Sequence, residues 1–146
     1  MTLQQYNEID SRIAMMTTVA EGKEWIANGK TLHAFLKHRG FGIQEVNKMM
    51  YRILLLEHKT GKLLDGLVKH GTNRYRHSSE TTLEELGVSP WDARRWRKVA
   101  KVDPEDIRIY CEENPDLATR AGLLRLHTES TTSPKKKTCP NCGYEL

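Results

Sequence analysis

Residues 81–101 read TTLEELGVSPWDARRWRKVAK and predict two short helices joined by a tight turn. Thr82 and Glu85 have the spacing of a capping box, which begins a helix, and Gly87 is suited to end it. Ser89 is then a favourable N-cap, and the proline after it stands where the first turn of a helix tolerates proline. The segment therefore predicts a helix-turn-helix.

The second of these helices has an apolar side and a basic side. Ala93, Trp96 and Ala100 recur at helical spacing and predict the inward side, with Val99 beside them. Cations lie largely on the other side: Arg94, Arg95, Lys98 and Lys101, with Arg97 at the border. A basic second helix is the geometry that enters a DNA major groove. The alternative is an ordinary helical hairpin with a solvated basic face.

Composition suits a small or elongated helical protein better than a thick globule. The chain has 146 residues, a net charge of +4, 38% hydrophobic residues and 29% charged residues. A charge this small is compatible with nucleic acid but does not argue for it. Because no apolar run is long enough to cross a bilayer and the start lacks a signal peptide, we expect a cytoplasmic protein without a membrane partner.

Three longer helices are predicted before the helix-turn-helix. Residues 2–16 carry apolar side chains at helical spacing, a capping box at Thr18 begins a helix that runs toward Arg39, and a third helix spans 43–70. The expected inward residues are Leu3, Tyr6, Ile9, Ile13 and Met16, then Val19, Trp25, Ile26, Leu32, Phe35 and Leu36, then Ile43, Val46, Met50, Ile53, Leu54, Leu64, Leu67 and Val68. Because only the short break at 40–42 separates the second and third helices, we expect an antiparallel hairpin.

Three residues in this hairpin have more than one interpretation. Gly22 and Gly29 either weaken the second helix or let another helix approach closely. Glu57 falls on the apolar stripe of the third helix. We favour a charge at the stripe's margin, paired with Lys48, Arg52 or a neighbouring helix, over a buried polar contact that fixes helix register.

Two short helices with proline starts are predicted after residue 101. Asp103 opens one that runs to about Glu113, and Asn114 opens the next. Both would supply the core that the helix-turn-helix lacks alone, and Cys111 is expected to be a buried packing residue. The expected inner face of the last helix is Leu117, Ala121, Leu123 and Leu124.

The predicted fold class is all-α: a long antiparallel hairpin, a small helix-turn-helix domain and a flexible tail that ends in a cysteine knuckle. The boundaries are a scaffold or dimerisation hairpin at 1–70, a polar linker at 71–80, a helix-turn-helix domain at 81–127 and a tail at 128–146. The linker contains Arg74 and Arg76, which can reach phosphates or a minor groove, or remain solvated.

The tail contains Cys139 and Cys142 in the form Cys-Pro-Asn-Cys-Gly, which resembles half of a zinc ribbon. Structural zinc needs four ligands, which leaves three ways to complete the site: two chains share one ion, Cys111 or a histidine (His127 or a more distant one) folds back, or a partner protein supplies the missing ligands. The alternatives are a reduced disordered tail and a redox dithiol, of which the redox pair is less favoured. We expect zinc, shared between two chains.

Several short motifs resemble one group of proteins. They are LEHKTGKLL at 56–64, TLEELGVS at 82–89, RW at 95–96 and AGLL at 121–124. On these, residues 17–126 resemble small helical proteins encoded by bacteriophages, prophages and other mobile elements of bacteria. The resemblance implies a DNA-binding, helix-turn-helix fold in the cytoplasm of a bacterial host. The cysteine knuckle is not part of it.

The resemblance fails at one place, because PWDAR at 90–94 replaces the group's usual Lys-x-Gln-Ser-Ser/Ala before Arg-Trp. A target preference is therefore not transferable. We expect a homodimer that binds double-stranded DNA. The residues expected to contact DNA are Arg74, Arg76, Ser89, Trp91, Arg94, Arg95, Lys98 and Lys101.

The rival interpretation is a protein-interaction module in which the long hairpin binds a host or phage protein and the basic helix is only solvated. An enzyme is disfavoured, since the sequence shows no nucleophile with its base, no phosphate loop and no paired carboxylates at a telling spacing. The six histidines are scattered without a metal-ligand spacing.

Overall fold

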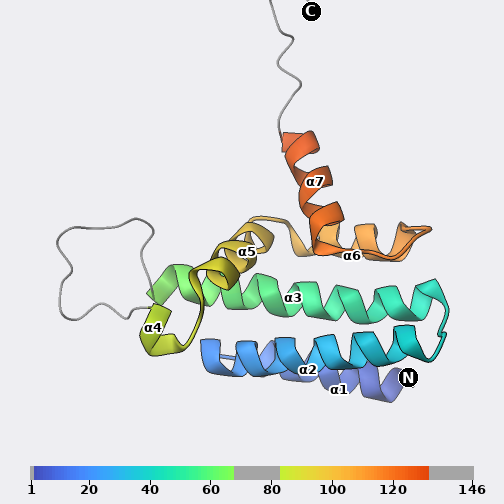
Figure 1. Cartoon of the computed structure of the whole chain (residues 1–146), viewed down its shortest axis with the longest axis horizontal. Helices are drawn as coiled ribbons and strands as arrows, with labels where there is room; N and C mark the ends of the chain where they lie inside the picture. Colours follow the sequence, from blue (N-terminus) through green and yellow to red (C-terminus); the bar gives the residue numbers. More distant parts are fainter. Residues whose placement is uncertain (1, 68–82, 132–146) are drawn as a thin grey trace, which may run out of the picture.

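The structure, a computed structural model, describes residues 2–67 and 83–131, and the side chains of these as far as residue 128. Within these ranges the chain forms seven helices and no strand (Figure 1), which confirms the all-α class. The helices are α1 (Leu3–Met15), α2 (Val19–His38), α3 (Ile43–Leu67), α4 (Leu83–Leu86), α5 (Pro90–Ala100), α6 (Pro104–Glu113) and α7 (Arg120–Thr131).

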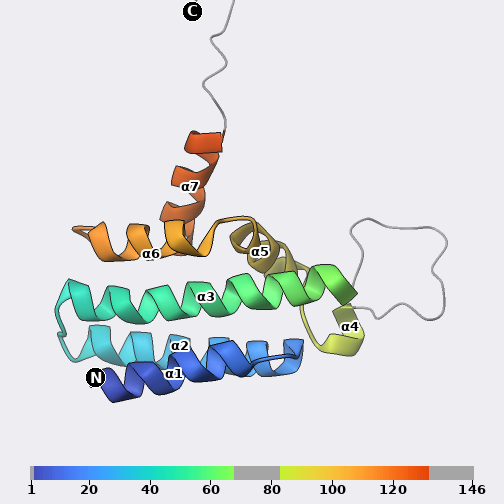
Figure 2. The ribbon, with the colours of Figure 1, turned by 180° about the vertical axis from the view of Figure 1, so that it is seen from behind.

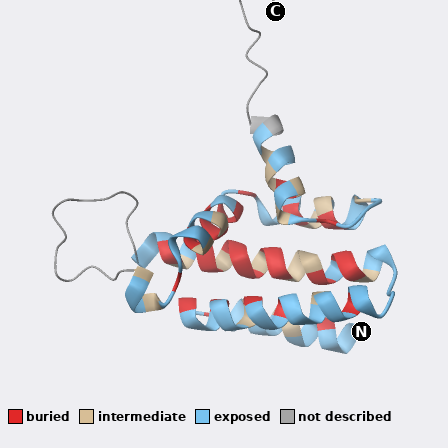
Figure 3. Ribbon diagram, in the orientation of Figure 1, coloured by how far each residue is buried: buried red, intermediate tan, exposed pale blue. Residues whose placement is uncertain are grey.

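Helix α3 lies at the centre of the molecule. In the two opposite views, α1 and α2 cover one side of α3 while α5 and α6 cover the other (Figures 1 and 2). Buried residues are concentrated on α3, whereas α7 stands away from the body and has Leu123 as the one buried residue among its described side chains (Figure 3). None of the described helices is long and apolar enough to cross a membrane.

The predicted antiparallel hairpin is confirmed as α2 and α3. The Thr18 hydroxyl accepts the N–H of Glu21 at 3.2 Å and begins α2, and Gly40 ends it at a φ of 75° that favours glycine. At Gly22 a Cβ would overlap the hydroxyl of Thr60, and at Gly29 it would lie 3.0 Å from Ile53. The two glycines therefore let α2 and α3 approach closely.

Helix α1 is held on α3 by polar contacts around one aromatic ring. The Tyr6 hydroxyl donates to the carboxylate of Glu45 at 2.7 Å, and the Arg52 guanidinium pairs with Asp10 at 3.1 Å. The Lys59 ammonium donates to two carbonyl oxygens at the end of α1, at 2.6 and 2.9 Å. A lysine there satisfies carbonyls that the helix leaves without a partner. The first helix thus completes part of the core.

Several residues predicted to face inward are open to solvent. On α2 these are Leu32 and Phe35, which are 38% and 51% exposed. Leu3, Ile43, Leu67 and Leu117 are likewise exposed. The stripes continue past the surface that the neighbouring helices cover, so helical spacing alone overestimated the core.

The last helix begins later than predicted, at α7 rather than at Asn114. The side-chain oxygen of Asn114 accepts the N–H of Asp116, which closes a turn instead of capping a helix. Asn47 on α3 then holds the extended chain, donating to the Asp116 carbonyl at 2.9 Å and accepting from the Ala118 N–H at 2.8 Å. The hydroxyl of Thr119 accepts an N–H of the first turn at 3.0 Å and starts α7, which continues beyond residue 127.

Glu57 is fully buried, so the favoured margin interpretation is wrong. Its carboxylate accepts hydrogen bonds from Arg120 of α7, one from Nε at 2.7 Å and one from a terminal guanidinium nitrogen. Burial acts to lower the pKa of Arg120, but the hydrogen bond and charge of Glu57 outweigh it and raise that pKa. The pair joins the base of α7 to α3.

The core is shared between the residues on the two sides of the predicted linker. Leu64 of α3 and Trp96 of α5 belong to one buried cluster. A second cluster joins Leu54 to Ile107 and Cys111 of α6, which confirms Cys111 as a packing residue. The linker at 71–80 lies outside the described residues, but the parts it joins pack together.

Candidate nucleic-acid interface

Helix α5 is positioned by the turn predicted from the sequence. Gly87 has a φ of 68°, and Val88 after it is buried. The Ser89 Oγ accepts the N–H of Asp92 at 3.1 Å, which makes Ser89 the N-cap. The exposed hydroxyl hydrogen of Ser89 can still donate to a ligand.

The inner side of α5 anchors it on α3. Ala93, Trp96 and Val99 are buried, as the helical spacing predicted. The crossing is closest at Gly61, where a Cβ would overlap the carbonyl oxygen of Trp96. Arg97, which the spacing placed at the border, lies inward and its Nε is 3.1 Å from a carboxylate oxygen of Asp65. Since α5 is fixed on this side, its outer side is presented rigidly.

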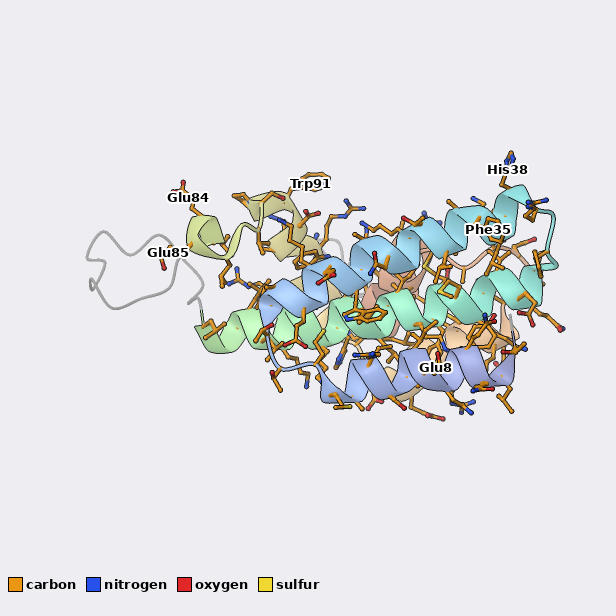
Figure 4. All side chains as sticks on the ribbon, turned by 90° about the horizontal axis from the view of Figure 1, so that it is seen from below. Glu8, Phe35, His38, Glu84, Glu85 and Trp91 are labelled. Carbon is orange, nitrogen blue, oxygen red and sulfur yellow. The ribbon has the colours of Figure 1, made fainter. Side chains whose placement is uncertain are left out.

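The outer side of α5 carries the predicted cations. Arg94, Lys98 and Lys101 are exposed and Arg95 is half-buried. The Arg95 guanidinium lies 5.8 Å from the ring centre of Trp91, which is 65% exposed. Figure 4 shows Trp91 projecting away from the helical body.

These four outer cations form no ion pair with any residue in the described ranges. Arg52, Arg97, Arg108 and Arg120 each pair with a carboxylate, whereas Arg12, Arg39 and Arg125 resemble the outer cations of α5 in having no ion pair among the described residues. Arg108 contacts both Glu105 and Glu112, which raises its pKa. The charges on the outer side of α5 are thus not neutralised by a carboxylate within the described ranges.

Acidic residues border this basic surface at one end. Glu84 and Glu85 are exposed on α4, and Asp92 is half-buried in the first turn of α5. Figure 4 shows Glu84 on the same side of the molecule as Trp91. The positive surface therefore extends from Arg94 toward Lys101, the C-terminal end of α5, rather than toward α4.

One cationic residue near this surface was missed by the sequence reasoning. Arg125 of α7 lines a cleft together with Lys98 and Lys101 of α5. Its position in the sequence carried no signal, because α7 was expected to begin six residues earlier, although the expected inner residues Leu123 and Leu124 do pack in the core.

Four predicted site residues lie outside the described residues: Arg74, Arg76, Cys139 and Cys142. The ranges 2–67 and 83–128 contain no group of three acidic, histidine or cysteine side chains that could hold a metal. Cys111 is a poor candidate to complete a zinc site, because it is 2% exposed and burial raises the pKa of its thiol to about 12. His127 is half-buried on α7.

Comparison with known proteins adds no assignment: no family model matches this chain, and neither a curated protein nor a solved structure is similar to it.

Proposed function

We propose that this protein binds double-stranded DNA with α5 as the recognition helix, in a non-enzymatic regulatory or replication-associated role of the phage type. The observation that carries the proposal is the set of outer cations on α5 without ion pairs among the described residues. A fixed helix with such a face delivers Arg94 and Arg95 to guanine edges or phosphates. The resemblance of the motifs to phage-encoded proteins agrees with this role.

Loss of the two arginines is expected to weaken DNA binding. Arg94→Ala with Arg95→Ala should raise the Kd for duplex DNA by about 10-fold or more at moderate salt, because each arginine contact contributes roughly 1–3 kcal/mol. Fluorescence anisotropy with a labelled duplex measures it.

The matched control removes two cations elsewhere. Lys30 and Lys37 are exposed on α2, so Lys30→Ala with Lys37→Ala changes the net charge equally and should alter the Kd only slightly. An equal Kd for the arginine variant and the wild type, or equal losses in both variants, would refute α5 as the recognition helix.

A groove between α1 and α2 favours protein association as a second role. It has a volume of about 520 Å³. Its lining is Gln5, Glu8, Ile9, Arg12, Trp25, Leu32, Phe35, Leu36 and Phe41. Phe35 and Phe41 are 51% and 42% exposed, so apolar surface faces solvent here. Figure 4 shows Glu8 on α1 and Phe35 on α2.

We propose that a second copy of the chain fills this groove. Glu8 and Arg12 lie one turn apart on α1, and neither forms an ion pair with a described residue; Arg12 instead lies over Trp25 at 5.9 Å. Two such helices related by a twofold axis perpendicular to them run antiparallel, and this arrangement brings Glu8 of one copy to Arg12 of the other. The groove of one copy is thus complementary in charge to the groove of the other.

Phe35→Ser is expected to shift the protein from dimer to monomer. The change removes apolar surface from the groove without touching the buried core. Sedimentation equilibrium measures the mass, and Leu3→Ser, which removes an exposed leucine outside the groove, should leave it unchanged. A wild-type monomer, or a dimer unaffected by Phe35→Ser, would exclude this interface.

We propose zinc binding from the sequence alone, with Cys139 and Cys142 from each of two chains as the ligands. Protein purified without chelator should contain one zinc per two chains, and Cys142→Ser should abolish it. Because Cys111 is buried, Cys111→Ala should keep the same zinc content, as measured by elemental analysis. Absence of zinc from the wild type, or its loss from a folded Cys111→Ala variant, would contradict the assignment.

A further inference from the structure

A cleft opens between the C-terminal end of α5 and the middle of α7. Its volume is about 570 Å³. The lining residues are Lys98, Lys101, Ala121, Leu124, Arg125, His127 and Thr128. The two helices that form its walls come from parts of the sequence that are separated by α6.

The chemistry of the lining divides into a basic rim and an apolar floor. Lys98, Lys101 and Arg125 bring positive charge, and no carboxylate is among the described residues that line the cleft. Lys101 and Arg125 are exposed and make no ion pair with a described residue. Ala121 and Leu124 supply the apolar surface between them.

The wall formed by α7 is anchored at its base. Arg120 is paired with buried Glu57, and Leu123 packs in the second core cluster at 3% exposure. Farther along, Leu126 is 52% exposed. The base therefore sets the direction of α7, and the remainder projects away from the body of the molecule (Figures 1 and 2).

We infer that this cleft binds the sugar–phosphate backbone of the same duplex that α5 contacts; the inference rests on the proposed function. A phosphate needs cations at the rim, and the carbon face of a deoxyribose fits an apolar floor. The basic surface of α5 continues into the cleft, away from the acids of α4. Lys101 and Arg125 bind phosphate, while Leu124 contacts the sugar.

The inference deepens the proposed function, because it gives α7 a positioning role. Recognition helices are oriented on DNA by backbone contacts from neighbouring elements. A backbone strand held between α5 and α7 sets how deeply the first turns of α5 enter the groove. These contacts carry affinity but no preference for base sequence.

The test is the salt dependence of DNA binding by Lys101→Ala with Arg125→Ala. Loss of two phosphate contacts is expected to reduce the slope of log K against log salt by about 2, since each contributes roughly 0.9. The Kd should rise by a similar factor for every duplex sequence. Lys30→Ala with Arg108→Ala removes the same residue types away from the cleft and should leave the slope unchanged.

The outcomes separate this inference from the proposed function. If Arg94→Ala with Arg95→Ala weakens binding but the cleft variant keeps the wild-type slope, the cleft inference is overturned and the recognition helix stands. If the slope falls by about 2 while the Arg94/Arg95 variant binds normally, the cleft stands and the recognition helix fails. A wild type that does not bind duplex DNA overturns both.

An acidic polypeptide is the competing ligand for such a cleft. Labelled poly-glutamate is therefore measured in parallel at the same salt concentrations. If it binds the wild type, loses affinity in the cleft variant, and the slope for DNA does not change, the cleft is a peptide site and the inference is wrong.

Discussion

Arg120→Ala is expected to lower the free energy of unfolding by about 3–5 kcal/mol. The substitution leaves the Glu57 carboxylate at 0% exposure without the guanidinium that satisfies both its oxygens. An unpaired buried charge is costly because neither water nor another cation replaces the lost partner. Urea unfolding followed by circular dichroism measures the loss.

Two further variants test whether the loss of stability comes from breaking the buried pair or from removing any arginine. Arg108→Ala removes an exposed arginine from its pairs on α6 and should change stability little, since solvent screens such pairs. Glu57→Met with Arg120→Leu removes both buried charges and should recover much of the loss. If Arg120→Ala were as stable as the wild type, the buried pair described here would be wrong.

Gly61→Ala is expected to destabilise the protein by about 1–3 kcal/mol and to displace α5. The new Cβ would overlap the Trp96 carbonyl oxygen and lie 2.7 Å from its carbonyl carbon, which are main-chain atoms. Main-chain atoms in a helix cannot rotate aside as a side-chain end can, so α5 must shift as a unit. Thermal unfolding and Trp96 fluorescence report the two effects.

Gly66 provides a matched control in the same helix. A Cβ there meets nothing within 4 Å. Gly66→Ala should therefore raise the free energy of unfolding by up to about 0.5–1 kcal/mol, since alanine favours the helix and restricts the unfolded chain. Equal effects at the two positions would mean that the close crossing of α3 and α5 does not exist.

The sequence predicted the parts of the fold that local chemistry determines. The caps at Thr18, Ser89 and Asp103 begin helices where expected, and Gly40 and Gly87 end them. These signals are reliable because a cap or a positive φ is satisfied by atoms within a few residues. The prediction of the inner side of α5 was also correct, because its apolar residues recur at helical spacing.

The errors arise where a distant residue decides the local structure. Asn114 followed by proline resembles a helix start. However, the chain after it is held out of a helix by Asn47, which lies 71 residues before Ala118 in the sequence and accepts its N–H. Glu57 is buried because Arg120, 63 residues later, supplies a charge. Periodicity within one helix carries no information about which neighbour will cover it.

The same distinction between local and distant determinants applies to the residues of the candidate site. The outer cations of α5 were identified from helical spacing, and the structure places them on one exposed side. Arg125 was missed because its significance depends on the path of α7 relative to α5, which no motif encodes. The expected arm at Arg74 and Arg76 lies outside the described residues and stays a prediction.

The central place of α3 has a consequence for how such a protein can change. The surface of α5 that packs on α3 includes the buried apolar side chains of Trp96 and Val99. A segment containing only the helix-turn-helix would expose that surface if it were transplanted to another protein. The helix-turn-helix is therefore not a portable module. Under the proposed function, new DNA targets would be acquired through substitutions at exposed positions such as Trp91 and Arg94, with the rest of the chain kept unchanged.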